Sequence, residues 1–91
     1  MNSATTEANV WTRVIHPEQG DLPSSAALAL AELHFDSADL NAMRELSQRN
    51  QAGELSSDEQ EALQTYRRVG MILDLLRSKA RLSLRQADRT S

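Results

Sequence analysis

Four arginines near the C-terminal end of the chain recur at every fourth position: Arg77, Arg81, Arg85 and Arg89. Side chains four residues apart share one side of an α-helix, so this spacing predicts a row of positive charge along a helix. We call these four residues the basic stripe. Guanidinium groups bind carboxylates and phosphates. We rank three interpretations in this order: a solvated helix face, a surface for an acidic protein partner, and a nucleic-acid surface.

The sequence contains no recognisable catalytic or metal-binding motif. His16 and His34 stand in separate segments without paired ligand spacing, and most carboxylates fall at predicted helix starts, where capping explains them. The chain has no cysteine, which excludes disulfides, thiolate metal sites and cysteine nucleophiles. We therefore expect a protein that is not an enzyme and needs neither a cofactor nor a metal.

Length and charge favour a small protein-binding domain over a nucleic-acid-binding one. Ninety-one residues allow one domain with a modest core. Residues 1–65 carry three basic and eleven acidic side chains, whereas residues 66–91 carry seven basic and two acidic ones. The net charge of −3 and the scarcity of aromatic residues make direct nucleic-acid binding the weaker alternative.

The sequence also predicts a cytoplasmic protein. Its first residues show no basic start followed by an apolar core, as a secretory signal would. Its longest apolar cluster, residues 69–76, is interrupted by Asp74 and is too short to span a bilayer.

Helix-start and helix-stop signals predict an all-α fold with helices over residues 24–34, 37–51 and 57–86 in a helical domain of residues 24–87. The clearest start is Ser56 with Glu59, a capping box in which each residue satisfies a backbone N–H of the other. Gly53 is suited to end the preceding helix. Because the turn between these two helices is short, we expect an antiparallel helical hairpin with a long C-terminal helix and a tail of residues 88–91.

Residues 1–23 are predicted to form a flexible or extended N-terminal arm. Residues 10–15 are rich in β-branched side chains but too short and solitary for a sheet. We favour Trp11 packing across the helices, since a lone tryptophan usually joins a core. The alternative is an arm that lies on a partner protein.

The long helix has more apolar surface than one short helix can cover. A heptad-like seam joins Leu63, Tyr66, Gly70, Leu73, Arg77, Ala80 and Leu84, and a second row widens it in the middle. Glycine destabilises a helix interior, so Gly70 indicates either a close helix crossing at that point or a chance substitution. The predicted interface for a partner or a second copy consists of Tyr66, Val69, Gly70, Ile72, Leu73, Leu76 and Trp11.

Six segments of the sequence stand out: WTRVI at 11–15, LHF at 33–35, MREL at 43–46, GELS at 53–56, YRRVG at 66–70 and LDLLRSKARLSL at 73–84. Together with Pro17-Glu18, Gly20-Asp21-Leu22, Asp39 and Asp58-Glu59, they resemble a family of short, uncharacterised bacterial proteins often encoded beside HNH-type endonucleases. The resemblance covers residues 10–85, and its most distinctive part is residues 69–82. The family often has Ser-Pro or Thr-Pro at helix starts, where this chain has Asp36-Ser37 and Ser56-Ser57.

The resemblance implies an antitoxin-like or accessory role toward a neighbouring nuclease, with no catalytic residue in this chain. We therefore expect a non-catalytic protein–protein interaction module that binds through its long helix and N-terminal arm. The alternatives are a homo-oligomer, such as a dimer formed by the long helix, and a weak nucleic-acid binder that uses the basic stripe.

Overall fold

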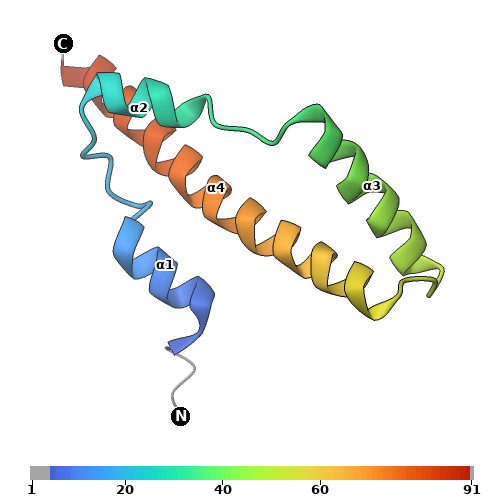
Figure 1. Cartoon of the computed structure of the whole chain (residues 1–91). Helices are drawn as coiled ribbons and strands as arrows, with labels where there is room; N and C mark the ends of the chain where they lie inside the picture. Colours follow the sequence, from blue (N-terminus) through green and yellow to red (C-terminus); the bar gives the residue numbers. More distant parts are fainter. Residues whose placement is uncertain (1–4, 91) are drawn as a thin grey trace. The chain divides into compact units, whose positions relative to one another are not determined.

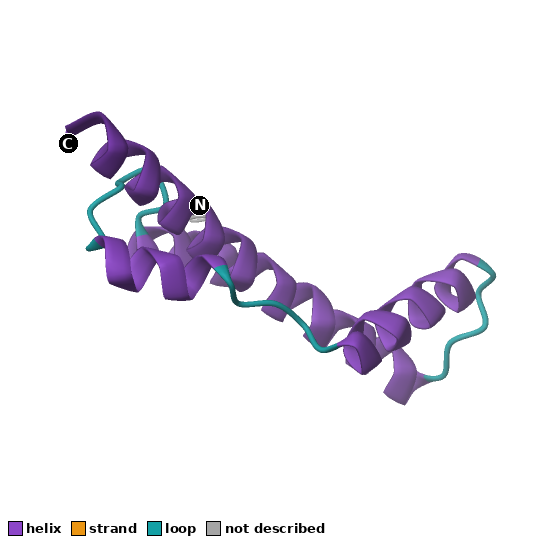
Figure 2. Cartoon of the chain, turned by 90° about the horizontal axis from the view of Figure 1, so that it is seen from above, coloured by secondary structure: helices purple, strands orange, loops and turns teal. Residues whose placement is uncertain are grey.

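The computed structural model describes the backbone of residues 5–90 and the side chains of residues 5–88. Over this range the chain forms helices and no strand, which confirms the predicted all-α class (Figures 1 and 2). The helices are α1 (Glu7–Ile15), α2 (Ser24–Ala31), α3 (Ser37–Gln51) and α4 (Ser57–Thr90). They belong to two compact units. The first holds α1, α2 and the part of α4 from Met71 onward, and the second runs from His34 to Gly70.

The prediction of an extended N-terminal arm is wrong for residues 7–15, which form α1. The hydroxyl of Thr6 caps this helix by accepting a hydrogen bond from the Asn9 N–H at 3.2 Å, and Glu7 adds a carboxylate in the first turn. At the other end His16 adopts the left-handed conformation with φ 55°, and its N–H donates to the Thr12 carbonyl. These terminal hydrogen bonds outweigh the weak β preference of the apolar residues between them.

The first unit packs α2 against α4 through small side chains. Ala27 on α2 and Ala80 on α4 are fully buried, and Ser83, one turn further along α4, is almost fully buried. Figures 1 and 2 show α2 lying beside the later turns of α4. Alanine and serine keep few atoms between helices, so the two backbones can approach closely. Helix α2 ends at Ala31, three residues before the predicted end at residue 34.

In the second unit, helix α3 begins at Ser37 and ends at Gln51, which are the predicted bounds. Asp36 occupies the N-cap position, although its side chain makes no capping hydrogen bond. After the last turn Gly53 takes φ 72°, and its N–H donates to the Asn50 carbonyl at 3.0 Å. A positive φ is strained for most residues and free for glycine, which confirms the predicted stop at Gly53.

The start of α4 confirms the predicted capping box. The Glu59 N–H donates to Ser56 Oγ at 3.2 Å, and the Ser56 N–H donates to Glu59 Oε1 at 3.0 Å. From Ser57 the helix continues for 34 residues to Thr90, so it runs past the predicted end at residue 86 and includes residues 88–90 of the predicted tail. No helix in the described part of the chain is both long and apolar enough to cross a membrane.

Candidate interaction surfaces

The residues predicted to form one interface are divided between the two units. Tyr66, Val69 and Gly70 belong to the second unit, which ends at Gly70. The first unit contains the other four predicted residues, all of them half-buried: Trp11 on α1 and Ile72, Leu73 and Leu76 on α4. Each unit is therefore considered separately as a surface for a partner.

Tyr66 joins α3 to α4 inside the second unit. Its hydroxyl donates a hydrogen bond to Asp39 Oδ1 at 2.7 Å, and its ring meets Phe35 edge-on, with centroids 6.0 Å apart and planes 72° apart. The hydrogen bond to the Asp39 carboxylate raises the pKa of the Tyr66 phenol above its ordinary value of 10.0. Both polar and aromatic groups of Tyr66 thus already have partners within the chain.

Gly70 lies beside Phe35 and not at a tight helix crossing. A Cβ added at Gly70 would meet only the Phe35 ring, at 3.8 Å and 4.0 Å, which is ordinary van der Waals contact. The expectation of a close helix crossing at Gly70 is therefore wrong, and the alternative of a chance substitution stays open. The neighbouring Val69 is exposed, with 42% of its surface accessible, and remains available to a partner.

An ion pair between Arg49 and Glu59 links α3 to α4 beside the turn that joins them. The two terminal guanidinium nitrogens of Arg49, Nη1 and Nη2, both donate to the Glu59 carboxylate, with Nη2 at 2.9 Å from Oε1. The same carboxylate accepts the Ser56 N–H, and these bonds, led by the one from Arg49, lower the pKa of Glu59 below its ordinary value of 4.5. The sequence shows Glu45 four residues before Arg49, but the guanidinium binds the more distant Glu59 because the turn brings it alongside.

Large apolar side chains are more often exposed than buried in the described residues. The buried apolar residues are Ala27, Leu63 and Ala80, and no large side chain is fully buried. The exposed large apolar residues are Val10, Val14, Leu28, Leu33, Leu40 and Val69. A single exposed apolar residue is normal, but this ratio shows that the chain leaves much apolar surface uncovered.

Helix α1 carries the most exposed of these residues, and the sequence interpretation missed it as a helix. Val14 is 66% accessible, Val10 is also exposed, and α1 has no buried residue. The spacing of Val10 with Val14, and of Trp11 with Ile15, is the four-residue spacing of a helix face. That spacing, together with the capping residue Thr6, is the signal that could have revealed α1.

The basic stripe is partly occupied by contacts within the first unit. Arg77 Nη2 pairs with Asp74 Oδ1 at 3.0 Å, and its Nη1 is 3.5 Å from the Leu33 carbonyl oxygen. Arg81 and Arg85 are exposed, and the side chain of Arg89 lies outside the described residues. With Arg77 held by neighbours, the exposed and described part of the predicted stripe reduces to two arginines.

The segment between α1 and α2, residues 16–23, is fastened to α4, and we call it the strap. Lys79 Nζ lies 2.7 Å from Asp21 Oδ1 and donates to the His16 carbonyl at 3.2 Å. The side chain of Lys79 is only 11% accessible. The hydrogen bond from Lys79 lowers the pKa of the Asp21 carboxyl below its ordinary value of 3.8.

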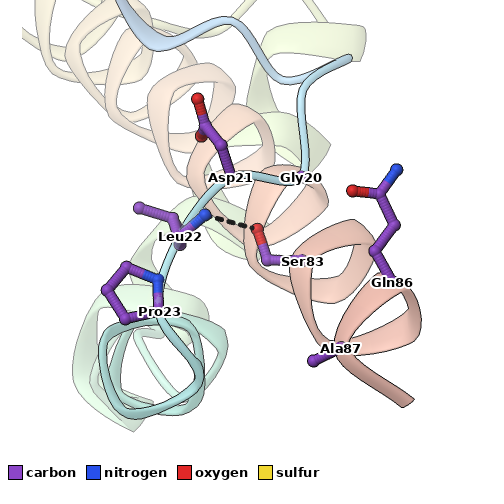
Figure 3. Close-up of a pocket in the computed structure, with 7 residues that line it drawn as sticks. All are labelled: Gly20, Asp21, Leu22, Pro23, Ser83, Gln86 and Ala87. Carbon is purple, nitrogen blue, oxygen red and sulfur yellow. Dashed lines mark hydrogen bonds between the residues drawn. The ribbon is translucent and has the colours of Figure 1, made fainter. Parts of the chain in front are cut away.

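Ser83 fastens the strap at a second point, at the edge of a shallow hollow. Its hydroxyl accepts the Leu22 N–H at 3.1 Å (Figure 3). The same hydroxyl donates to the Lys79 carbonyl at 2.8 Å. The hollow has a volume of about 470 Å³ and is lined by Gly20, Asp21, Leu22, Pro23, Ser83, Gln86 and Ala87. Since the Ser83 hydroxyl gives its single hydrogen to the Lys79 carbonyl and the residue is almost fully buried, it is not free to donate to a ligand there.

Comparison with known proteins gives no family for the chain. Protein-family models, curated proteins and solved structures contain no match to it. The resemblance to the family encoded beside HNH-type endonucleases therefore stays a prediction. Within the described residues, no group of three or more histidine, aspartate or glutamate side chains could hold a metal ion.

Proposed function

We propose that this chain is a non-catalytic helical module whose uncovered apolar surface binds another protein. The observation that carries the proposal is the exposure of large apolar side chains such as Val14 and Leu28, beside a core in which no large side chain is fully buried. Covering such side chains is the main source of binding free energy in protein interfaces. A partner that covers them would complete the burial that the chain lacks alone.

In this proposal the scaffold is an antiparallel hairpin of α3 and the first part of α4. Support comes from the order of its contacts: Asp39, early in α3, bonds to Tyr66, and Arg49, late in α3, bonds to Glu59 near the start of α4. Such a hairpin has one face committed to internal packing and its outer faces free. It would hold its own exposed apolar residues, Leu40 and Val69, on a rigid frame.

We further propose that the partner is an HNH-type nuclease in the cytoplasm, and that the chain is its antitoxin-like or accessory protein. This step rests on the sequence resemblance alone. The test is co-expression of the chain with the product of the gene adjacent to its own, followed by size-exclusion chromatography with light scattering. A stable complex is the expected result, and two separate species would overturn this choice of partner.

Paired variants test whether the exposed apolar residues provide the binding surface. Val14→Gln and Leu28→Gln are expected to weaken the complex about tenfold each, because interface truncations at important positions cost more than about 1 kcal/mol. Gln64→Ala, at an exposed polar position of α4, is the matched control and should bind normally. Circular dichroism checks that all three variants keep their helix content. Equal affinity in all of them would overturn the assignment of the surface.

Self-association is the second candidate, and the same exposed valines and leucines support it. Light scattering of the chain alone distinguishes the two. A concentration-dependent dimer that Val14→Gln or Leu28→Gln disrupts would favour a homo-oligomer, whereas a monomer at tens of micromolar would remove this candidate. The weaker alternative of nucleic-acid binding predicts affinity that falls steeply with salt and depends on Arg81 and Arg85.

A further inference from the structure

The only lysine in the sequence, Lys79, lies in a nearly buried position. Ten side chains are lysine or arginine, and the other nine are all arginines. The side chain of Lys79 is 11% accessible, whereas Arg81, two residues further along α4, is exposed. Lysine side chains usually keep their charged end in water. The single side-chain amine of the sequence is therefore held where such groups are seldom found.

Two groups of the strap lie on the Lys79 ammonium. Its Nζ is 2.7 Å from Asp21 Oδ1 and donates to the His16 carbonyl at 3.2 Å. An ammonium carries three N–H donors on one compact nitrogen, so it can bond to two acceptors that lie close together. The planar guanidinium of an arginine would need more room. This difference gives a physical reason for a lysine within an arginine-rich segment.

The strap backbone leaves little space for any group added beside this amine. A Cβ added at Gly20 would lie 2.9 Å from the carbonyl carbon of Leu82, which is closer than Cβ atoms come to other atoms in proteins. Leu82 is three residues after Lys79, so it lies about one turn further along α4. A reagent that reaches Nζ, or a group attached to it, therefore has to displace part of the strap.

From these contacts we infer that Lys79 is a guarded acylation site. The folded first unit protects its amine, and an acyl group that is added during a transient opening then destabilises the first unit. The reagent is an activated acyl group, carried as an ester or thioester. The inference concerns the chain alone and does not depend on the identity of a protein partner.

The chemistry of acyl transfer explains the protection. An ammonium has no lone pair, so Lys79 must first release a proton to water. The nitrogen then attacks the acyl carbonyl carbon and forms a C–N bond, and the bond from that carbon to its oxygen or sulfur leaving group breaks. The leaving group departs with the electron pair, and the nitrogen loses a second proton. None of these steps is open to an ammonium that is bonded to Asp21 and covered by the strap.

The product explains the loss of stability. An acylated lysine is a neutral amide with a single N–H donor. It cannot form the ion pair with Asp21, and its acyl group needs space in a position that is nearly buried. The refolded first unit must therefore lose this ion pair and shift the strap to admit the acyl group.

Labelling of the full chain with the acetyl ester of N-hydroxysuccinimide tests the protection. Arg81→Lys is the matched variant, because it adds an amine at an exposed position of the same helix and keeps the charge. In the folded variant, Lys79 should be acetylated at least about tenfold more slowly than the new amine, since only opened molecules react. In concentrated urea the two rates should be equal. Mass spectrometry of a protease digest separates these two sites from any other amine.

Thermal melting followed by circular dichroism tests the effect of the acyl group. Wild type that is acetylated at Lys79 in urea and then refolded should melt at a lower temperature than untreated wild type. Arg81→Lys that is acetylated in the folded state carries the group at the exposed position and should melt like its untreated form. Asp21→Asn, which removes the ion pair without any modification, should speed acetylation of Lys79 in the folded chain.

Three results would overturn the inference. Acetylation of Lys79 in the folded chain as fast as that of the exposed amine would show that the fold gives no protection. An unchanged melting midpoint after acetylation of Lys79 would show that the contacts of its ammonium do not stabilise the first unit. An unchanged acetylation rate in Asp21→Asn would show that the ion pair does not guard the amine.

Discussion

The hydroxyl of Tyr66 donates a hydrogen bond to the Asp39 carboxylate at 2.7 Å, and it thereby joins the first turn of α3 to the third turn of α4. Twenty-seven residues of sequence separate the two groups. Phe35 adds an edge-on ring contact at the same place. This small cluster is therefore a main support of the second unit, and it gives the first prediction.

Tyr66→Phe should lower the thermal midpoint of the chain by a few degrees. The variant keeps the ring contact with Phe35 but leaves the Asp39 carboxylate without its donor. Differential scanning calorimetry or circular dichroism measures the midpoint. Thr65→Ala, one position earlier and exposed, removes a hydroxyl that bonds only to its own helix and is the matched control. Equal midpoints for Tyr66→Phe and Thr65→Ala would contradict this role of Tyr66.

Substitution by alanine should stabilise the chain at Gly70 and destabilise it at Gly53. At Gly70 the added Cβ meets only Phe35 at ordinary distance, so Gly70→Ala should stabilise the chain by up to about 1 kcal/mol. At Gly53, where φ is 72°, Gly53→Ala should destabilise it by about 1 kcal/mol even though the space is open. Urea unfolding followed by circular dichroism measures both. A loss of stability in Gly70→Ala would show that glycine is needed there after all.

The stability of the second unit should fall in acid because of Glu59. Arg49 lowers the pKa of this carboxyl below 4.5 in the folded chain. Its stabilising contribution is therefore complete above about pH 4.5 and is lost as the pH falls through the lowered folded-state pKa. Glu59→Gln lacks this titration. The difference in stability between the wild type and Glu59→Gln should thus shrink between about pH 5 and pH 3 in urea unfolding experiments.

The matched control for the acid experiment is Glu61→Gln, an exposed carboxylate two residues further along α4. This variant controls for the loss of one exposed carboxylate from the same helix. A difference that shrinks equally in both variants would contradict the specific role of the Arg49–Glu59 pair.

The contact between α2 and α4 should not tolerate a larger side chain at Ala27. Ala27 is fully buried, so Ala27→Leu should cost about 1–3 kcal/mol through overpacking. Ala29→Leu makes the same change at an exposed position of α2 and should alter stability by no more than about 0.5 kcal/mol. Chemical denaturation of the two variants compares them. Similar stabilities would mean that α2 does not pack closely on α4.

Local sequence signals predicted the helix boundaries that depend on nearby residues. The capping box of Ser56 and Glu59 and the stop at Gly53 each involve groups within a few residues of one another. Helix α1 followed the same kind of signal, through Thr6 and Asn9, but the β-branched residues after them concealed it. The sequence therefore did not predict α1, because the β preference of residues 10–15 counted for more than the capping signal of Thr6.

The sequence did not show which of the charged side chains form ion pairs with one another. Glu45 stands at the favourable helical spacing from Arg49, yet Arg49 binds Glu59. Lys79 and Arg77 belong to the same basic segment, yet one holds the strap and the other holds Asp74. Helical spacing shows which charges can meet within a helix, but which ones do meet depends on the segments that pack beside that helix.

By itself the sequence determined the helical class, the start of α4, the end of α3 and the absence of disulfides, because composition and contacts over a few residues control these features. Only the tertiary structure decided that Tyr66 turns inward to Asp39, that Gly70 has room for a methyl group, and that Lys79 and Ser83 hold a strap more than fifty residues earlier in the chain. Such contacts form only when distant segments are folded together, and no local periodicity specifies them.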